Sequence, residues 1–262
     1  MSVAPATTHV LSSRASAELR AAPDGRAECV SQCLFGERVT VLDGQTDWYR
    51  VRNARDGYEG WLHGAVLDEA EAVPAATHHV RVSATLLFES PDIKSPVLLR
   101  LPLGSELALA GDVDGTPFAR VARGVGRADA FVWGDHCRSI HRVPEGSPVA
   151  LAQRLFANTP YLWGGRTPDG ADCSGLVQSV AFALGITLPR DSGDQERFVE
   201  RAVDPAERGP SDLVFWPGHV GLLIDAHTLF HATAHCLASV AEPLADVVDR
   251  AGTPSSIRRL TS

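Results

Sequence analysis

A chain of 262 residues is long enough for two or three domains, since a domain averages about 150 residues. Hydrophobic residues make up 44% and charged residues 21% of it, a globular composition that excludes an extensively disordered chain. The net charge of −8 argues against general binding to nucleic acid or acidic membrane surfaces, so we expect a small partner.

The N-terminal segment, residues 1–28, contains no apolar run of signal-peptide length, and no later run could span a bilayer. We therefore expect a cytoplasmic protein with no membrane partner. The cysteines are odd in number and irregularly spaced, unlike a secreted disulfide framework, which predicts reduced thiols. They are Cys29, Cys33, Cys137, Cys173 and Cys236.

Residues 27–67 alternate short apolar runs with Asp-Gly turn signals, which predicts a small β barrel. Residues 69–77 are rich in Ala and Glu and lack core periodicity, so they are predicted to be a linker. The segment "LFGERVTVLDGQTDWYRVRNARDGYEGWL" resembles a bacterial SH3-type domain, a fold common as a targeting module beside wall-hydrolysing enzymes. We place this first domain at residues 1–72.

A second β-rich region follows, with strands predicted at 79–88, 105–110, 118–122 and 130–133 and turns at 111–116 and 124–127. Both regions contain a "G-[ES]-x-[VL]-x-[VL]" strand, beginning at Gly36 and Gly104, and a later strand with a tryptophan, Trp61 or Trp133. This weak repeat predicts a second small barrel of the same kind, at residues 73–145.

The pattern changes after residue 145 to a mixture of helices and strands. Helices are predicted at 151–157 and 173–184, the second with apolar residues at helical spacing and Gly185 as its stop. Short apolar runs at 213–216, 219–224 and 228–232 predict strands. Residues 146–262 are therefore predicted to form an α+β domain.

Cys173 is the candidate nucleophile. It opens the second predicted helix, where unpaired N–H groups and the helix dipole favour a thiolate, and Asp172 suits the N-cap. A free cysteine is more often a small buried hydrophobe. Its place between Asp172 and Ser174, after the polar segment "GGRTPDGA", favours catalysis over core filling.

His219 is the candidate general base, since an imidazole can take up the thiol proton and return it to a leaving amine. It begins an apolar strand directly after Pro-Gly. An antiparallel hairpin centred on Asp225 would set it opposite His231 on one face, where His231 would accept the far ring N–H of His219. A structural histidine is the alternative, and it is the interpretation that we prefer for His9, His63, His78, His79, His136 and His141.

Five motifs in order, "YLWGG…DCSGLVQ…LPRDSGDQ…SDLVFWPGHVGLLI…LFHA", resemble the NlpC/P60 family of papain-like cell-wall peptidases over residues 150–241. With two SH3-type units in front, the chain resembles the γ-D-glutamyl-L-diamino acid endopeptidases of that family. The resemblance implies an α+β papain-like domain preceded by two small SH3-like β barrels. It also implies Cys173 as nucleophile, His219 as base and His231 as the orienting third residue.

Substrate contacts are predicted next to the nucleophile. Asp172 and Ser174 flank Cys173 and can meet an ammonium and amide groups, although Asp172 could serve as a helix cap alone. The backbone N–H of Cys173 is a natural oxyanion donor. Tyr161, in "YLWGG", could wall the cleft or hydrogen-bond near the thiolate, or only pack.

Further contacts are implied by the resemblance. Asp191 and Ser192, in the polar turn "PRDSGDQ", would line the substrate cleft; a solvated loop is the alternative. The first SH3-type unit would close one end of the cleft, with Glu37 and Tyr58 holding the free ammonium of the substrate. Both residues could equally be ordinary barrel surface.

Three other functions compete. A metal site in "HATAHC", using His231, His235 and Cys236, has poor ligand spacing and no accompanying CxxC or HExxH pattern. A non-catalytic protein that binds peptidoglycan is opposed by the intact Cys173, His219 and His231. Acyl transfer or amidase chemistry through the same thioester stays open.

The sequence thus predicts a cysteine endopeptidase that needs no metal or cofactor. Its expected substrates are peptidoglycan-derived peptides with a free N-terminal L-Ala, cleaved between γ-D-Glu and an L-diamino acid such as diaminopimelate. We expect it to act in the recycling of cell-wall peptides.

Overall fold

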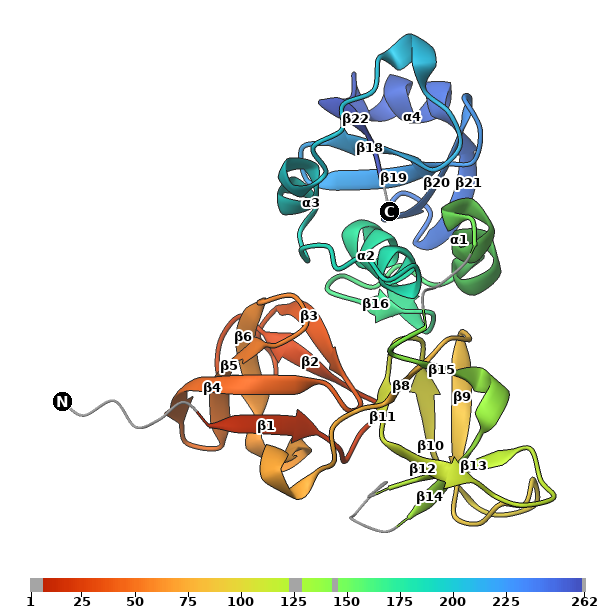
Figure 1. The fold of residues 1–262 in the computed structure, drawn as a ribbon. Coiled ribbons are helices and arrows are strands. Elements are labelled where there is room, and N and C mark those ends of the chain that lie inside the picture. Colours follow the sequence, from red (N-terminus) through yellow and green to blue (C-terminus); the bar gives the residue numbers. More distant parts are fainter. Residues whose placement is uncertain (1–6, 123–128, 143–145, 261–262) are drawn as a thin grey trace. The chain divides into compact units, whose positions relative to one another are not determined.

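The computed structural model describes residues 7–122, 129–142 and 146–260 of the chain. The chain divides into two compact units, Met1–Arg142 and Val143–Ser262 (Figure 1). The first unit is built almost entirely of strands, and the second mixes strands with helices. The predicted division of the first unit at residue 72 into two barrels stays a prediction.

The N-terminal part of the first unit is an antiparallel sheet with the strand order β3-β2-β6-β5-β4-β1-β7. Its strands are β1 (Thr8–Leu11), β2 (Ser16–Arg20), β3 (Cys29–Leu34), β4 (Arg38–Gln45), β5 (Trp48–Asn53), β6 (Glu59–His63) and β7 (Leu67–Glu69). Side chains of these strands, Leu11, Leu19, Cys33, Val39, Val51 and Leu62, form a core with Val66 of the 3₁₀ helix Gly64–Val66. The linker predicted at 69–77 begins too early, because β7 pairs with β1 and a 3₁₀ helix, Ala70–Ala72, follows it.

The rest of the first unit contains two smaller sheets, β10-β9-β14-β13-β12 and β11-β8-β15. Their strands are β8 (His78–Val80), β9 (Ala84–Phe88), β10 (Val97–Pro102), β11 (Glu106–Leu107), β12 (Leu109–Asp112), β13 (Phe118–Val121), β14 (Ala130–Trp133) and β15 (Cys137–Ser139).

Two strand predictions in this region are wrong in the same way. The segments 79–88 and 105–110 each divide into two strands that lie in different sheets. β12 also runs into the turn predicted at 111–116. The strand predicted at 130–133 is confirmed, and the turn predicted at 124–127 lies outside the described residues.

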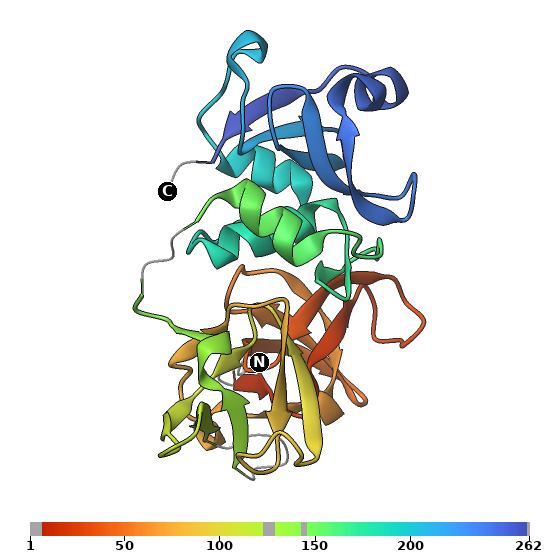
Figure 2. The same cartoon turned by 90° about the vertical axis from the view of Figure 1, so that its right-hand side faces the viewer.

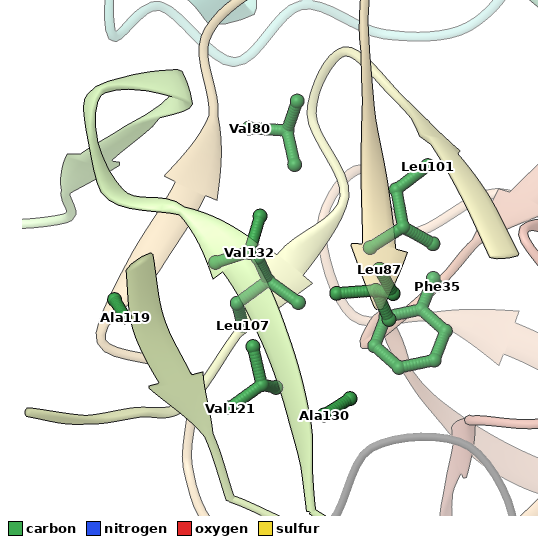
Figure 3. Close-up of a cluster of buried hydrophobic side chains, with 9 residues drawn as sticks. All are labelled: Phe35, Val80, Leu87, Leu101, Leu107, Ala119, Val121, Ala130 and Val132. Carbon is green, nitrogen blue, oxygen red and sulfur yellow. The ribbon is translucent and has the colours of Figure 1, made fainter. Parts of the chain in front are cut away.

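A buried apolar cluster joins the two parts of the first unit (Figure 3). Its members Val80, Leu87, Leu101, Leu107, Ala119, Val121, Ala130 and Val132 are joined by Phe35 from the turn after β3. The backbone N–H of Glu106 donates to the Phe35 carbonyl at 2.8 Å. Gly36, with φ +82°, has no room for a side chain here, because a Cβ would lie 2.1 Å from the Glu106 carbonyl oxygen.

The second unit is an antiparallel sheet in the order β21-β20-β19-β18-β22, with helices on both of its sides (Figures 1 and 2). Its strands are β18 (Asp212–Trp216), β19 (His219–Leu223), β20 (Thr228–Thr233), β21 (Ala238–Pro243) and β22 (Ser256–Arg259), with a short separate pair, β16 (Arg166–Thr167) and β17 (Gly170–Ala171). Its helices are α1 (Pro148–Phe156), α2 (Cys173–Ala183), α3 (Ser192–Phe198) and α4 (Leu244–Ala251).

The helices and strands predicted for this unit are confirmed, with small shifts at their ends. α1 begins three residues before the predicted start, because Pro148 occupies its first turn, a position that tolerates the missing N–H. α4 packs Leu244 and Val247 onto the sheet side chains Val214, Trp216, Leu223 and Leu229, with Ile257 of β22. Within the described ranges no helix is long and apolar enough to cross a membrane.

Candidate active site

Cys173 is the first residue of α2, and its side chain is almost completely buried beside the start of β19. Its Sγ lies 3.9 Å from the carbonyl oxygen of Gly218, and the backbone N–H groups of Val220 and Ser174 hydrogen-bond to it. The thiol therefore packs against the backbone on both sides of His219. Position 175 in the first turn of α2 requires glycine, because a Cβ there would lie 2.1 Å from the Gly165 carbonyl oxygen.

The thiol of Cys173 is neutral in this environment. Burial raises its pKa to about 11, and the carboxylate of Asp172 adds to the increase, whereas the two backbone N–H groups and Arg190 oppose it. The helix N-terminus does supply hydrogen bonds that favour the thiolate, as expected, but desolvation of the charged form outweighs them. A neutral thiol becomes a strong nucleophile only when a base removes its proton.

His219 and His231 lie next to each other on one face of the sheet. Nε2 of His219 is 2.8 Å from Nδ1 of His231, and the rings meet edge to face with centroids 5.0 Å apart. The hairpin centre predicted at Asp225 is wrong by one residue, because Leu222 pairs with Phe230 about position 226. The two histidines are consequently staggered along the strands, but both stay on one face since the strand period is two.

His219 is uncharged at neutral pH and can accept a proton, although its lowered pKa makes it a weaker base than a free imidazole. Burial lowers its pKa to about 4, with further lowering by His231 and Arg250, while Glu242 acts in the opposite direction. The neutral imidazole therefore predominates above that pH.

Three residues that the sequence analysis missed surround the histidine pair. Nε2 of His231 lies 2.8 Å from Oε1 of Glu242, and Nη2 of Arg250 is 3.1 Å from each Glu242 oxygen. The ring of Trp216 lies 5.9 Å from that of His219, and its Nε1 donates to the Gly252 carbonyl. The sequence analysis predicts no strand at 238–243; such a prediction would have identified Glu242 as a neighbour of His231.

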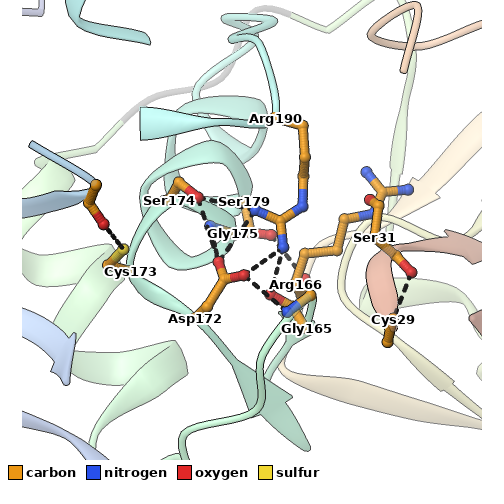
Figure 4. A network of polar contacts seen from close by, with 12 residues as sticks. Cys29, Ser31, Gly165, Arg166, Asp172, Cys173, Ser174, Gly175, Ser179 and Arg190 are labelled. Atoms are coloured by element: carbon orange, nitrogen blue, oxygen red, sulfur yellow. Dashed lines mark hydrogen bonds and ion pairs between the residues drawn. The ribbon is translucent and has the colours of Figure 1, made fainter. Parts of the chain in front are cut away.

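Asp172 caps α2 and also forms an ion pair (Figure 4). Its Oδ1 accepts from the Gly175 N–H at 2.7 Å, and its Oδ2 from the Gly164 N–H at 2.9 Å. Arg190, whose side chain is 1% exposed, donates to both oxygens at 3.0 and 2.6 Å, and to the Ser174 hydroxyl at 2.8 Å. The cap is confirmed; the ammonium contact stays a prediction, and it would have to replace one of these donors.

Asp191 and Ser192 do not form the predicted polar turn, because Ser192 is the first residue of α3 and Asp191 precedes it as N-cap residue. Asp191 is exposed and Ser192 is buried. The buried amide of Gln195, one turn along, donates to the carbonyls of Ser174 and Pro189 at 3.0 and 2.9 Å. α3 is thereby anchored beside the N-terminus of α2, and lining of the cleft stays a prediction.

Tyr161 lies near the nucleophile. Burial raises the pKa of its hydroxyl to about 12, and the carboxylate of Asp172 contributes to the increase, as would Cys173 once ionised. The phenol therefore keeps its proton and is a hydrogen-bond donor at neutral pH. Its contact with substrate stays a prediction.

Glu37 is not available to a substrate, so its predicted role is wrong. Its side chain is fully buried in the first unit, where Oε1 pairs with Arg55 at 2.7 Å. Oε2 accepts from the Leu34 N–H and from the Asn53 amide at 2.9 and 2.8 Å. Arg55 also contacts Glu106, so the carboxylate helps to join the two parts of this unit.

Tyr58 lies in the first unit, in the turn immediately before β6, and is half-buried. Its backbone N–H donates to the carboxylate of Asp56 at 3.0 Å, and its carbonyl accepts from the Asn53 N–H. Its role in substrate binding stays a prediction. For the rival metal site, no group of three or more His, Cys, Asp and Glu side chains suited to a metal occurs in the described part of the chain.

Comparison with known proteins identifies the second unit. The model of the NlpC/P60 family matches residues 158–245, which include Cys173, His219, His231 and Glu242. Dipeptidyl-peptidase 6 of Lysinibacillus sphaericus is 30% identical over 234 residues, covering 83% of this chain and 84% of that protein. This chain belongs to the NlpC/P60 family.

Other relatives agree with this NlpC/P60 assignment. The γ-D-glutamyl-L-lysine dipeptidyl-peptidase of Bacillus subtilis is 29% identical over 225 residues, covering 77% of this chain and 71% of that protein. The crystal structure of an NlpC/P60 family protein from Bacillus cereus has the same fold, with a TM-score of 0.83, 22% identity and coverage of 96% and 99% of the two chains.

The predicted fold class is confirmed: an NlpC/P60 domain of the α+β class is preceded by a β-rich, SH3-like region. The model of the bacterial dipeptidyl-peptidase SH3 domain matches residues 19–67. These residues fall within the first predicted barrel. A second SH3-type barrel in this chain stays a prediction.

The neutral thiol of this NlpC/P60 protein has a measurable consequence. The rate of Cys173 alkylation by iodoacetamide should keep rising with pH above neutrality, because the reactive thiolate forms with a pKa of about 11. The rate is measured by mass spectrometry of the Cys173 peptide in a Cys236→Ser background, which removes the exposed cysteine. A fast rate that is constant around neutral pH would reveal a thiolate–imidazolium pair and contradict the neutral ground state.

Proposed function

We propose that this chain is a cysteine peptidase that hydrolyses the γ-D-glutamyl-L-diamino acid bond of peptidoglycan peptides. The observation that carries the proposal is the placement of the Cys173 thiol against Gly218 and Val220, on either side of a histidine that is hydrogen-bonded to His231. A nucleophile, a base and a group that orients the base are the parts that this chemistry requires.

The reaction proceeds through a thioester. Sγ of Cys173 attacks the γ-carbonyl carbon of D-Glu while His219 takes the thiol proton, and the backbone N–H of Cys173 stabilises the oxyanion with the Tyr161 hydroxyl as a second donor. Collapse of the tetrahedral intermediate breaks the C–N bond, and His219 returns the proton to the departing amine. Water, deprotonated by the same imidazole, then hydrolyses the thioester and restores the thiol.

The substrate class is supported by relatives whose names describe their activity. The Bacillus subtilis relative is a γ-D-glutamyl-L-lysine dipeptidyl-peptidase, and the same name is given to a Bacillus cereus protein that is 30% identical over 234 residues. A dipeptidyl-peptidase removes two residues from a free N-terminus. We therefore propose peptides that begin with L-Ala-γ-D-Glu, already released from the wall and being recycled, as the substrates of this chain.

Recognition of the free ammonium and its neighbouring amide is proposed to involve Asp172 and Ser174, and Asp191 and Ser192 are proposed to line the cleft. Tyr58 is proposed as a further substrate contact. Acetylation of the L-Ala amine should lower kcat/KM by more than about tenfold, because a lost charged hydrogen bond typically costs about 2 to 5 kcal/mol. The amide-linked L-Ala of intact sacculi should be refused for the same reason. Free and acetylated L-Ala-γ-D-Glu-diaminopimelate are compared by chromatography of the products.

Tyr58→Ala tests the contribution of the first unit in the same assay, with Gln45→Ala, an exposed position of that unit, as the matched control. The discrimination between free and acetylated tripeptide should shrink in Tyr58→Ala and persist in Gln45→Ala. Equal kcat/KM for the two tripeptides with the unaltered protein, or rapid digestion of sacculi, would refute recognition of the free amine.

A further inference from the structure

We propose that Glu242, held by Arg250, is a positioning residue that fixes the tautomers of both active-site histidines. The inference rests on the proposed function, since it assigns a role within the same reaction. It concerns residues outside the predicted triad of Cys173, His219 and His231, on β21 and α4.

The geometry is a continuous chain of hydrogen bonds across three strands and a helix. His219 of β19 meets His231 of β20 at 2.8 Å, and the second nitrogen of His231 meets Glu242 of β21 at 2.8 Å. Arg250, in the last turn of α4, contacts both Glu242 oxygens at 3.1 Å. His231 is 1% exposed, so its nitrogens are shielded from bulk solvent.

Glu242 determines which nitrogen carries the proton in each imidazole of this hydrogen-bond series. An ionised carboxylate only accepts hydrogen bonds, so Nε2 of His231 must carry a proton. In a neutral imidazole the other nitrogen, Nδ1, then has a lone pair and accepts from Nε2–H of His219. Nδ1 of His219 is left with the lone pair, which makes it the nitrogen that takes the thiol proton of Cys173.

The charges around the pair agree with this assignment. Hydrogen bonding to His231 and the nearby Arg250 keep the pKa of Glu242 below its ordinary value despite partial burial, so the carboxylate is ionised. Burial lowers the pKa of His231, against the pull of Glu242, so the imidazole stays neutral. Without Glu242, either nitrogen of His231 could carry the proton, and the wrong tautomer would turn an N–H toward His219.

The first experiment observes the tautomers without using activity. Long-range ¹H–¹⁵N correlation spectra of histidine-labelled protein, assigned with His219→Ala and His231→Ala, should show both imidazoles as Nε2–H tautomers. Glu242→Ala should give mixed tautomers at His231. Glu242→Gln, whose amide oxygen can still accept from Nε2–H, should keep the original tautomer, as should the control Asp246→Asn at an exposed carboxylate of α4.

The second experiment measures kinetics on L-Ala-γ-D-Glu-diaminopimelate. Glu242→Ala should lower kcat by about tenfold to 100-fold with KM nearly unchanged, a part of the 10²- to 10⁴-fold that a well-placed general base supplies. Glu242→Gln should recover most of this loss. Thermal melting of each variant identifies any that fail to fold.

The outcomes separate this inference from the proposed function. Unchanged tautomers in folded Glu242→Ala, or a kcat equal to that of the unaltered protein, would overturn the positioning role while leaving the peptidase intact. A lower kcat with unchanged tautomers would likewise reduce Glu242 to a structural residue. If the unaltered protein cleaves no γ-D-glutamyl peptide, the proposed function fails, and the tautomer spectra still test what Glu242 does.

Discussion

Cys173→Ala should abolish peptide hydrolysis while leaving the fold intact. The thiol forms the covalent intermediate in the proposed reaction, and alanine offers no nucleophile, so kcat/KM should fall by at least about 10⁴-fold, as for the loss of a nucleophile in comparable triads. Folding should persist, because alanine is smaller and Cys173 is held mainly through the backbone of α2, whose cap lies on Asp172.

The measurement is the initial rate on L-Ala-γ-D-Glu-diaminopimelate, with thermal melting as the check on folding. Cys236→Ala is the matched control, since it removes an exposed cysteine from the same unit and should keep full activity. Alkylation of Cys173 should reproduce the loss. Hydrolysis above background by folded Cys173→Ala would show that another group performs the chemistry.

His219→Ala should be nearly as damaging as the loss of Cys173. With the thiol pKa raised to about 11, almost no thiolate exists at neutral pH unless the imidazole takes the proton. The same side chain protonates the departing amine and activates water, so three steps lose their proton carrier. The expected loss in kcat/KM is at least about 10²- to 10⁴-fold.

His231→Ala should keep a measurable rate, because the base His219 remains and only its orientation and tautomer are no longer fixed. A graded series is therefore expected, with His231→Ala more active than His219→Ala. His227→Ala, at an exposed histidine in the turn between β19 and β20, is the control and should behave like the unaltered protein. Full activity in His219→Ala would exclude His219 as the base.

The parts of the site that the sequence could predict are those encoded in local periodicity and in short polar segments. The apolar spacing after Cys173 predicts α2, and the alternation after His219 predicts β19. A strand period of two places His219 and His231 on one face even when the hairpin centre is displaced by one residue. The predicted contact between the two histidines is therefore correct, although the predicted register of the hairpin is not.

The incorrect or missing predictions depend on residues distant in the sequence. The sequence around Glu37 indicates a surface carboxylate, whereas in the structure Glu37 is paired with Asn53 and Arg55. The resting state of Cys173 depends on desolvation by the surrounding chain, which a helix N-terminus alone does not reveal. Glu242 meets His231 only through the pairing of β20 with β21, where Leu229 lies opposite Glu242.

Identifying the bond that is cleaved, and the product that takes up oxygen from water, tests the proposed reaction most directly. L-Ala-γ-D-Glu-diaminopimelate is digested with the unaltered protein in water enriched in ¹⁸O, and the products are analysed by mass spectrometry. Thioester formation and hydrolysis at Cys173 should give L-Ala-D-Glu with one ¹⁸O in its γ-carboxylate, together with unlabelled diaminopimelate, and no products from Cys173→Ala. Release of free L-Ala, a label in diaminopimelate, or an uncleaved tripeptide would contradict this reaction.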